Sequence, residues 1–130
     1  MKEFLLLITI IFFHILDDFH LQGILASMKQ KSWWAEHYPD KLYRHDYIIA
    51  LIAHSFSWSF MVHLPAFVYL YITGKQMSLF FLIISFVVHT YCHARIDNDK
   101  ANRHIISLVD DQCIHFIQLI GIWMTFVLYR

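Results

Sequence analysis

The chain contains four long apolar segments, at about residues 4–22, 47–71, 77–97 and 105–129. Each is close to the roughly 20 helical residues needed to cross a hydrocarbon core about 30 Å thick. Inside lipid, every backbone polar group must be paired within the protein, which restricts spanning structures to helices and closed barrels. The apolar runs are continuous and lack the alternation of barrel strands. The sequence therefore predicts an all-α fold, an integral membrane four-helix bundle that forms a single transmembrane domain over residues 1–130.

Composition supports a membrane protein and argues against a nucleic-acid partner. Hydrophobic residues make up 58% of the chain, charged residues 15%, and the net charge is zero. A nucleic-acid-binding domain usually carries a basic excess. Residues 1–20 have the charged start and apolar run of a signal peptide, but no small-residue cleavage site follows, so we expect a retained helix. Cys92 and Cys113 fall within apolar segments, where we expect apolar packing instead of a disulfide framework.

The connections indicate how the helices are placed. Residues 23–46 form a polar loop whose tryptophans and tyrosines suit a membrane interface. We expect Pro65 to kink the second helix or to interrupt it, because proline removes a backbone hydrogen bond. Lys and Arg are concentrated on the side of the first and third loops, with seven residues against three: Lys29, Lys31, Lys41, Arg44, Arg95, Lys100 and Arg103 against Lys2, Lys75 and Arg130. This bias predicts cytoplasmic loops and external termini.

The ten histidines equal all the Lys and Arg residues together, and several share one depth with aspartates. His14 and Asp18 lie in the last third of the first segment, and His54 lies about two turns into the second. The pairs His93/Asp97 and Asp111/His115 lie near the same side in the third and fourth segments. Residues four apart project from one face of a helix. Ionisable residues within membrane helices are rare and usually functional, so we expect these side chains to converge.

The predicted cluster has the chemistry of a divalent metal site. We expect imidazole and carboxylate ligands from His14, Asp18, His54, His93, Asp97, Asp111 and His115. Zn²⁺ is the first expectation, with Mn²⁺ or Fe²⁺ as alternatives, and the number of ions stays open between one and two. Asp18 and Asp111 are the candidate catalytic carboxylates, since a spare aspartate can act as a general base.

Residues beside the pairs have less defined expectations. Asp17 and Asp110 each adjoin a better-placed aspartate and are as suited to supporting a ligand as to being one. His89 lies one turn from His93 and suits coordination, support or packing equally. Gln22 and Gln112 could orient a ligand or a water. Lys100 suits a phosphate, a lipid headgroup or solvent.

The ordered motifs resemble those of a small bacterial and phage membrane protein family, catalogued as domain of unknown function 3307. The matching residues are His14-x-x-x-Asp18-Phe19-x-Leu21-Gln22, Lys29, Leu51-x-x-His54, His93-Ala-Arg-Ile-Asp97-x-x-Lys100 and Asp111-Gln112-x-x-His115. The resemblance covers nearly the whole chain, although residues 30–46 form a longer loop than the family pattern. It implies a bacterial inner membrane location, with a phage-encoded origin as the alternative. The motif style is also similar to that of membrane-bound metal-dependent hydrolases, by analogy only.

Two classes of function follow, and whether the protein is an enzyme stays open. The first is a metal-dependent hydrolase acting on lipid or lipid-phosphate substrates near the predicted cytoplasmic side. The second is a non-enzymatic membrane protein, which would carry metal or protons, bind haem through His54 and His93, or act through a partner with a purely structural polar network. Membrane lipid, a second copy of the chain and another membrane protein are the expected partners.

Overall fold

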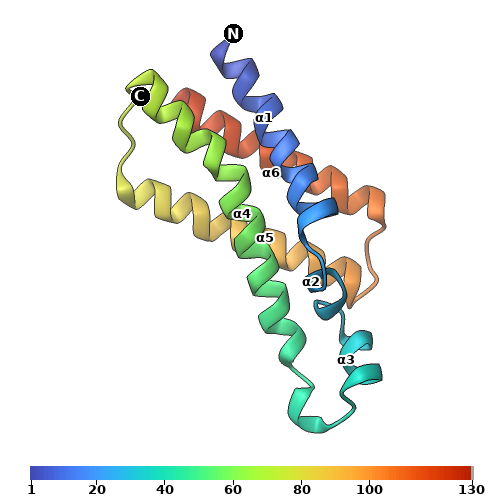
Figure 1. Ribbon diagram of the computed structural model, residues 1–130. Coiled ribbons are helices and arrows are strands. Elements are labelled where there is room, and N and C mark those ends of the chain that lie inside the picture. The colour runs from blue at the N-terminus through green and yellow to red at the C-terminus, as the bar shows by residue number, and fades with distance from the viewer. Residues whose placement is uncertain (130) are drawn as a thin grey trace.

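The computed structural model describes residues 1–129, so Arg130, which the orientation count includes, lies outside the described residues. The described chain is helical throughout, without strands (Figure 1). In order, the elements are α1 (Lys2–Leu16), the π-helical turn η1 (Asp17–Leu21), α2 (Leu25–Met28), α3 (Lys31–His37), the 3₁₀ turn η2 (Lys41–Tyr43), α4 (Asp46–Thr73), α5 (Leu79–Ala101) and α6 (Leu108–Leu128). The prediction of an all-α helical bundle is confirmed.

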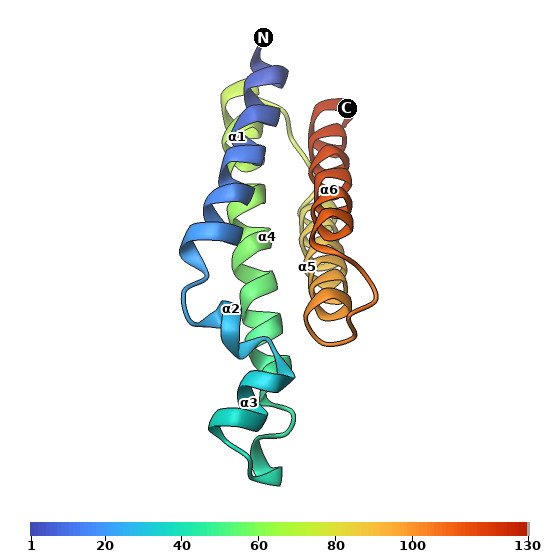
Figure 2. The ribbon, with the colours of Figure 1, turned by 90° about the vertical axis from the view of Figure 1, so that its right-hand side faces the viewer.

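The four long helices form two layers. α1 packs on α4 in one layer, and α5 packs on α6 in the other (Figure 2). α4 contacts all three of the other long helices, so it connects the layers. The start of α1 and the end of α6 lie at the same end of the bundle (Figures 1 and 2), and we call this the terminal end. The opposite end, which carries residues 23–46 and the α5–α6 connection, is the loop end.

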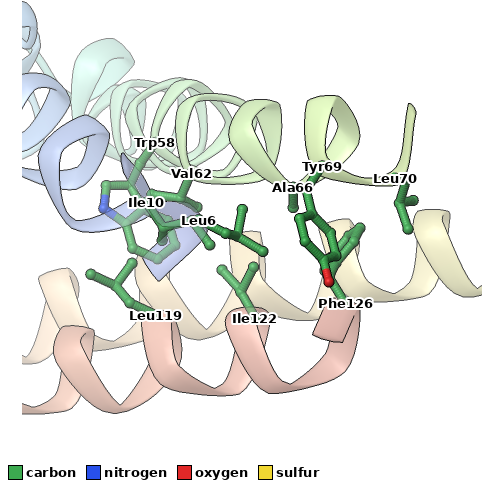
Figure 3. Close-up of a cluster of buried hydrophobic side chains, with 10 residues drawn as sticks. All are labelled: Leu6, Ile10, Trp58, Val62, Ala66, Tyr69, Leu70, Leu119, Ile122 and Phe126. Atoms are coloured by element: carbon green, nitrogen blue, oxygen red, sulfur yellow. The ribbon is translucent and has the colours of Figure 1, made fainter. Parts of the chain in front are cut away.

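An apolar core fills the terminal half of the bundle. Its fully buried members come from α1, α4 and α6 and interlock between the layers (Figure 3): Ile10, Trp58, Val62, Ala66, Leu119, Ile122 and Phe126. Burying such side chains stabilises a fold by about 1.5–3 kcal/mol each in water. Towards the loop end this core gives way to buried histidines and aspartates. The interior is therefore mainly apolar towards the terminal end, where His63, Ser59 and Ser85 are the buried polar exceptions, and polar in the half towards the loop end.

The outer surface of the long helices is as apolar as the core. Large hydrophobic side chains point outward on every one of them, including Phe12, Ile52, Phe80 and Ile117. The spans at Lys2–Leu21, Lys41–Thr73, Leu79–Ala101 and Leu108–Leu128 are each long and apolar enough to cross a membrane. Single exposed apolar residues are normal on soluble proteins, but a continuous apolar surface indicates contact with lipid or another protein.

Two local features refine the expectations. α4 runs unbroken from Asp46 to Thr73 through Pro65, so the proline does not interrupt the helix, and a kink is the expectation that stays open. Residues 23–46, predicted as a polar loop, contain the short helices α2 and α3 and the turn η2. The side chain of Asn102 fastens this segment to the end of α5. Its amide donates to the carbonyl of Lys29 at 3.0 Å, and its oxygen accepts from the backbone N–H of Lys31 at 2.7 Å.

Candidate metal centre

Four side chains from three elements bring their nitrogen and oxygen atoms together inside the polar half of the bundle. Nε2 of His54 in α4 lies 3.0 Å from Nε2 of His93 in α5. Oδ1 of Asp18 in η1 lies 3.4 Å from the first of these nitrogens and 3.9 Å from the second. Oδ2 of Asp97, one turn beyond His93, lies 3.1 Å from Nε2 of His54 and 3.7 Å from Nε2 of His93. The cluster joins both layers of the bundle.

These separations fit a bound divalent ion. A tetrahedral Zn²⁺ with bonds of about 2.0–2.1 Å holds its ligand atoms about 3.3 Å apart. The atoms of Asp18, His54 and His93 are separated by 3.0–3.9 Å, which brackets that spacing. All three side chains are almost fully buried, at 6% exposure or less. The donor atoms are thus arranged for an ion before one binds, and water is largely excluded around them.

A second, overlapping group shares His93 and Asp97 and adds His115 from α6. Oδ1 of Asp97, the oxygen that faces away from His54, lies 3.3 Å from Nε2 of His115. Oδ1 of Asp111 lies 3.4 Å from the same nitrogen and, although it is buried, finds no hydrogen-bond partner among the described residues 1–129. A buried carboxylate oxygen without a partner is costly. It therefore offers a further acceptor for a cation or a proton.

Ring stacking fixes the orientation of two of these histidines. Trp58 of α4 stacks on His93 with ring centroids 4.1 Å apart, and His93 stacks on His115 at 4.2 Å. The interplanar angles are 19° and 26°. The three rings form a column that crosses from α4 through α5 to α6. The sequence does not distinguish Trp58 from other aromatic residues of membrane helices, which usually lie in the core or face lipid.

Lys29, which belongs to the motif pattern quoted for the family resemblance but was not expected among the ligands, reaches into the centre from the end of α2. Its Nζ donates to Oδ2 of Asp97 at 2.6 Å and to Oε1 of Gln22 at 3.2 Å. Gln22 in turn donates to Oδ1 of Asp18 at 2.6 Å, so it orients that carboxylate as expected of it. From the sequence, Lys29 resembles the other basic residues of a polar loop. Only the packing of α2 on α4, which brings the Lys29 side chain within reach of Asp97 of α5, distinguishes it.

His14, expected among the ligands, has other partners. Its Nδ1 accepts a hydrogen bond from Trp58 Nε1 at 2.8 Å, and its Nε2 lies 3.2 Å from Oε1 of Gln112. Both ring nitrogens are thus occupied, and His14 belongs to neither metal-compatible group. The physical reason lies in η1, because a π-helical turn departs from the four-residue periodicity that would place His14 and Asp18 on one face. π turns are frequent at functional sites.

Asp111 lies beside the centre and is held by a lysine. Its Oδ2 accepts from Lys100 Nζ at 2.6 Å and from Gln112 Nε2 at 3.1 Å. Lys100, for which several roles were open, therefore forms an ion pair with Asp111 of α6. Gln112 also donates to Oδ2 of Asp18 at 3.2 Å, which links α6 to η1. The amide thus supports two carboxylates at once, in keeping with its expected orienting role.

The neighbouring aspartates separate into distinct roles. Asp17 is buried and accepts a hydrogen bond from Ser57 of α4 at 2.8 Å, while its second oxygen has no partner. Asp110 is exposed and forms a capping box with Ser107 at the start of α6, which is a structural role. His20 is exposed.

A further pair of histidines lies towards the terminal end, outside the centre. His63 is fully buried, with Nδ1 2.8 Å from the carbonyl of Ser59 and Nε2 3.0 Å from Oγ of Ser85. His89, for which three roles were open, lies with Nδ1 2.7 Å from the carbonyl of Ser85. Its ring packs against His63 at 5.4 Å between centroids. His89 therefore joins α5 to α4 and points away from the metal-compatible atoms.

Comparisons of the chain with protein-family models, with curated proteins and with solved structures find no match. The interpretation of the centre therefore rests on its own geometry. That geometry supports a buried cluster of His and Asp side chains with the spacing to hold a metal ion.

Proposed function

We propose that the protein is a metal-dependent membrane hydrolase whose ion is held by Asp18, His54 and His93, with Asp97 as the fourth donor. The observation that carries the proposal is the spacing of 3.0–3.9 Å among the atoms of the first three residues, which η1, α4 and α5 supply. Ionisable side chains inside membrane helices are costly and are usually retained for a function.

The donor set favours Zn²⁺, with Mn²⁺ and Fe²⁺ as alternatives. Imidazole nitrogens suit these ions, whereas Mg²⁺ and Ca²⁺ prefer sites made of oxygen atoms alone. When bound, such an ion supplies Lewis-acid chemistry, polarising a carbonyl or phosphoryl oxygen and activating water for attack. The overlapping group of His93, Asp97 and His115 is a second place where an ion could bind.

Haem fits the centre poorly. Two axial histidines must bind opposite faces of the iron, so the macrocycle lies between their nitrogens. The Nε2 atoms of His54 and His93 are only 3.0 Å apart, with the oxygens of Asp18 and Asp97 beside them. This arrangement leaves no space for a porphyrin between the two imidazoles.

Two side chains have geometry suited to roles in the reaction. Asp111 is anchored through Oδ2 by Lys100 and Gln112, while Oδ1 has no hydrogen bond and can accept a proton from an attacking water. Asp18 is held by Gln22 and Gln112 and offers Oδ1 as a ligand, so we assign the general-base role to Asp111. Lys29 and Lys100 bring positive charge to the centre from the loop end. Positive charge near the headgroup level suits a lipid or lipid-linked phosphate ester as substrate.

Metal content after purification in detergent tests the site. We expect the wild type to retain zinc, manganese or iron, and His54→Gln and His93→Gln to fall to background in elemental analysis. His63→Gln is the matched control, because His63 is equally buried but lies outside the centre. Full metal occupancy in both His54→Gln and His93→Gln would contradict the assignment of this metal site.

Hydrolysis is tested separately with the metal-loaded protein and a short-chain phosphatidic acid in micelles. We expect phosphate release from the wild type and, in Asp111→Asn, a loss of about 10²–10⁴-fold with metal content unchanged. No release above a protein-free control would count against the hydrolase while leaving the metal site intact.

A structural polar network is the second candidate, favoured by the two lysine–aspartate pairs at 2.6 Å. These pairs balance buried carboxylates without any ion. Under this alternative neither the wild type nor any variant binds metal. Every substitution in the cluster then lowers the stability of the fold and changes nothing else.

We further propose that the chain belongs to the uncharacterised bacterial and phage membrane family that its ordered motifs resemble. A bacterial inner membrane is the corresponding location, with the loop end facing the cytoplasm as the distribution of Lys and Arg predicts. A second copy of the chain or another membrane protein remains an expected partner. Reporter fusions at positions 1 and 130, compared with an insertion near residue 37, test the orientation.

A further inference from the structure

A second hollow lies at the loop end of the molecule, away from the metal centre. It has a volume of about 360 Å³ and is enclosed by α3, η2 and the start of α4. In both views the segment containing α3 projects beyond the ends of α5 and α6 (Figures 1 and 2). Ligand pockets commonly measure about 300–1,000 Å³. The hollow is therefore large enough for the polar part of a small molecule.

The wall of this hollow carries three cationic side chains without acidic partners. They are Lys31, Lys41 and Arg44. Among residues 1–129, no carboxylate lies within 4.0 Å of their charged groups. Asp40 also lines the hollow, but its side chain accepts a hydrogen bond from the backbone N–H of Leu42 at 2.9 Å. The charge of the wall is thus net positive and available to an anion.

Aromatic rings complete the wall and hold part of it in place. Trp34 donates from Nε1 to the carbonyl of Met28 at 2.6 Å, which fixes its ring. Nζ of Lys31 lies 5.0 Å from the centroid of the Tyr47 ring, a cation–π contact that positions the ammonium. Tyr38 lies in the same wall. Tryptophan and tyrosine are enriched where a membrane meets water.

The length of α4 places the hollow at the level of lipid headgroups. At 1.5 Å per residue, its 28 residues extend about 42 Å, against a hydrocarbon core of about 30 Å. The first turns of α4 therefore project from the core at the loop end, and the hollow is built around them. Directly beyond Tyr47, the apolar side chains of Ile48 and Ile49 are exposed on the helix surface, where acyl chains would lie.

We infer that this hollow binds the phosphate group of an anionic phospholipid headgroup. Lys31, Lys41 and Arg44 contact the phosphate, while Trp34, Tyr38 and Tyr47 pack against the glycerol and headgroup. The exposed isoleucines continue the surface towards the acyl chains. The site is independent of the metal centre, since it shares no residue with that cluster.

Native mass spectrometry of protein extracted from vesicles of equimolar phosphatidylglycerol and phosphatidylcholine tests the site. We expect the wild type to retain phosphatidylglycerol preferentially. In the double variant Lys41→Gln/Arg44→Gln the preference for phosphatidylglycerol should fall about tenfold, because each basic residue near a membrane surface contributes to anionic-lipid binding. Both side chains are exposed, so the fold should survive, which circular dichroism checks. The conservative exchange Lys41→Arg/Arg44→Lys should keep the preference.

Arg95→Gln/Arg103→Gln is the matched control, because it removes the same charge from exposed residues at the loop end but outside the hollow. The control should retain the wild-type preference. An equal loss in the control would show a diffuse charge effect and overturn the inference. So would binding of inorganic phosphate to the detergent-solubilised wild type, sensitive to Lys41→Gln/Arg44→Gln, without any preference for phosphatidylglycerol.

Discussion

Lys29 Nζ lies 2.6 Å from Oδ2 of Asp97, and both side chains are buried. This oxygen also lies 3.1 Å from Nε2 of His54. The lysine therefore contacts a carboxylate oxygen that a metal ion would use. A metal ion would compete with the lysine for this oxygen, whereas a polar network without metal would keep the contact. Variants of Lys29 separate these two possibilities.

Lys29→Met should destabilise the protein without added metal by about 3–5 kcal/mol, because it leaves a buried carboxylate without its cationic partner. Zn²⁺ should then stabilise this variant more than it stabilises the wild type, since the ion no longer competes with the Lys29 ammonium for Asp97. The measurement is thermal unfolding in detergent with and without Zn²⁺. Lys75→Met is the control, because Lys75 donates to backbone carbonyls of Val127 and Tyr129 and, among residues 1–129, pairs with no carboxylate. Equal Zn²⁺ responses in the wild type and Lys29→Met would favour the purely structural network.

His14→Gln should keep the bound metal while lowering stability. The imidazole of His14 bonds to Trp58 and Gln112 and belongs to neither metal-compatible group. The expected cost is about 1–3 kcal/mol, the usual range when a buried partner is left unpaired. Elemental analysis and thermal unfolding give the two readouts, with His54→Gln as the comparison. Loss of metal from both variants would restore His14 to the ligand set that the sequence predicted.

Trp58→Phe should also lower stability by about 1–3 kcal/mol, because it leaves Nδ1 of His14 buried without a donor. The phenyl ring can still pack against His93, so metal stoichiometry should stay unchanged. Trp123→Phe is the matched exchange, since Trp123 donates to the carbonyl of Glu3 at an exposed position. We expect it to cost less than Trp58→Phe in the same unfolding measurement. A larger effect at Trp123 would contradict the importance of the buried bond.

Two glycine-to-alanine exchanges should change the stability of the fold in opposite directions. Gly74 ends α4 with φ +68°, a left-handed conformation that costs a non-glycine residue about 1–2 kcal/mol. Gly121 lies inside α6, and a Cβ there meets no atom within 4 Å. Gly121→Ala should therefore stabilise by about 0.5–1 kcal/mol, since glycine weakens a helix interior. Thermal unfolding of both variants checks the pair, and shifts of the same sign would rule out this explanation.

The sequence predicted the helices well because the signal for a membrane span is local. Each apolar segment reports its own length and hydrophobicity, whatever the rest of the chain does. The position of α5 shows the limit of this signal. Its predicted end was Asp97, but the helix continues to Ala101, since the polar residues after Asp97 still form helical turns. Pro65 shows another limit, because α4 accommodates it without a break.

The candidate centre was only partly predictable. The His93/Asp97 and Asp111/His115 pairs do share helix faces, with 3.7 and 3.4 Å between the relevant atoms. His14 and Asp18 do not share a metal-compatible group but both bond to Gln112, and the π-helical turn η1 between them departs from the regular helical repeat. Trp58 was missed, and Lys29 entered only as one residue of the resembled family pattern, without a role in the site. Neither has a spacing that separates it from an ordinary loop lysine or an ordinary core tryptophan.

The sequence by itself determined that this chain has four apolar helices and that His and Asp side chains share one depth in them. Both properties follow from the residues of each segment taken separately, without knowing which segments pack together. Only the tertiary structure decided which atoms meet. The rotation of each helix about its axis places Asp18, His54 and His93 together, while the packing of α2 on α4 brings Lys29 to Asp97. Those choices arise from packing between segments distant in the chain, which periodicity within one segment cannot encode.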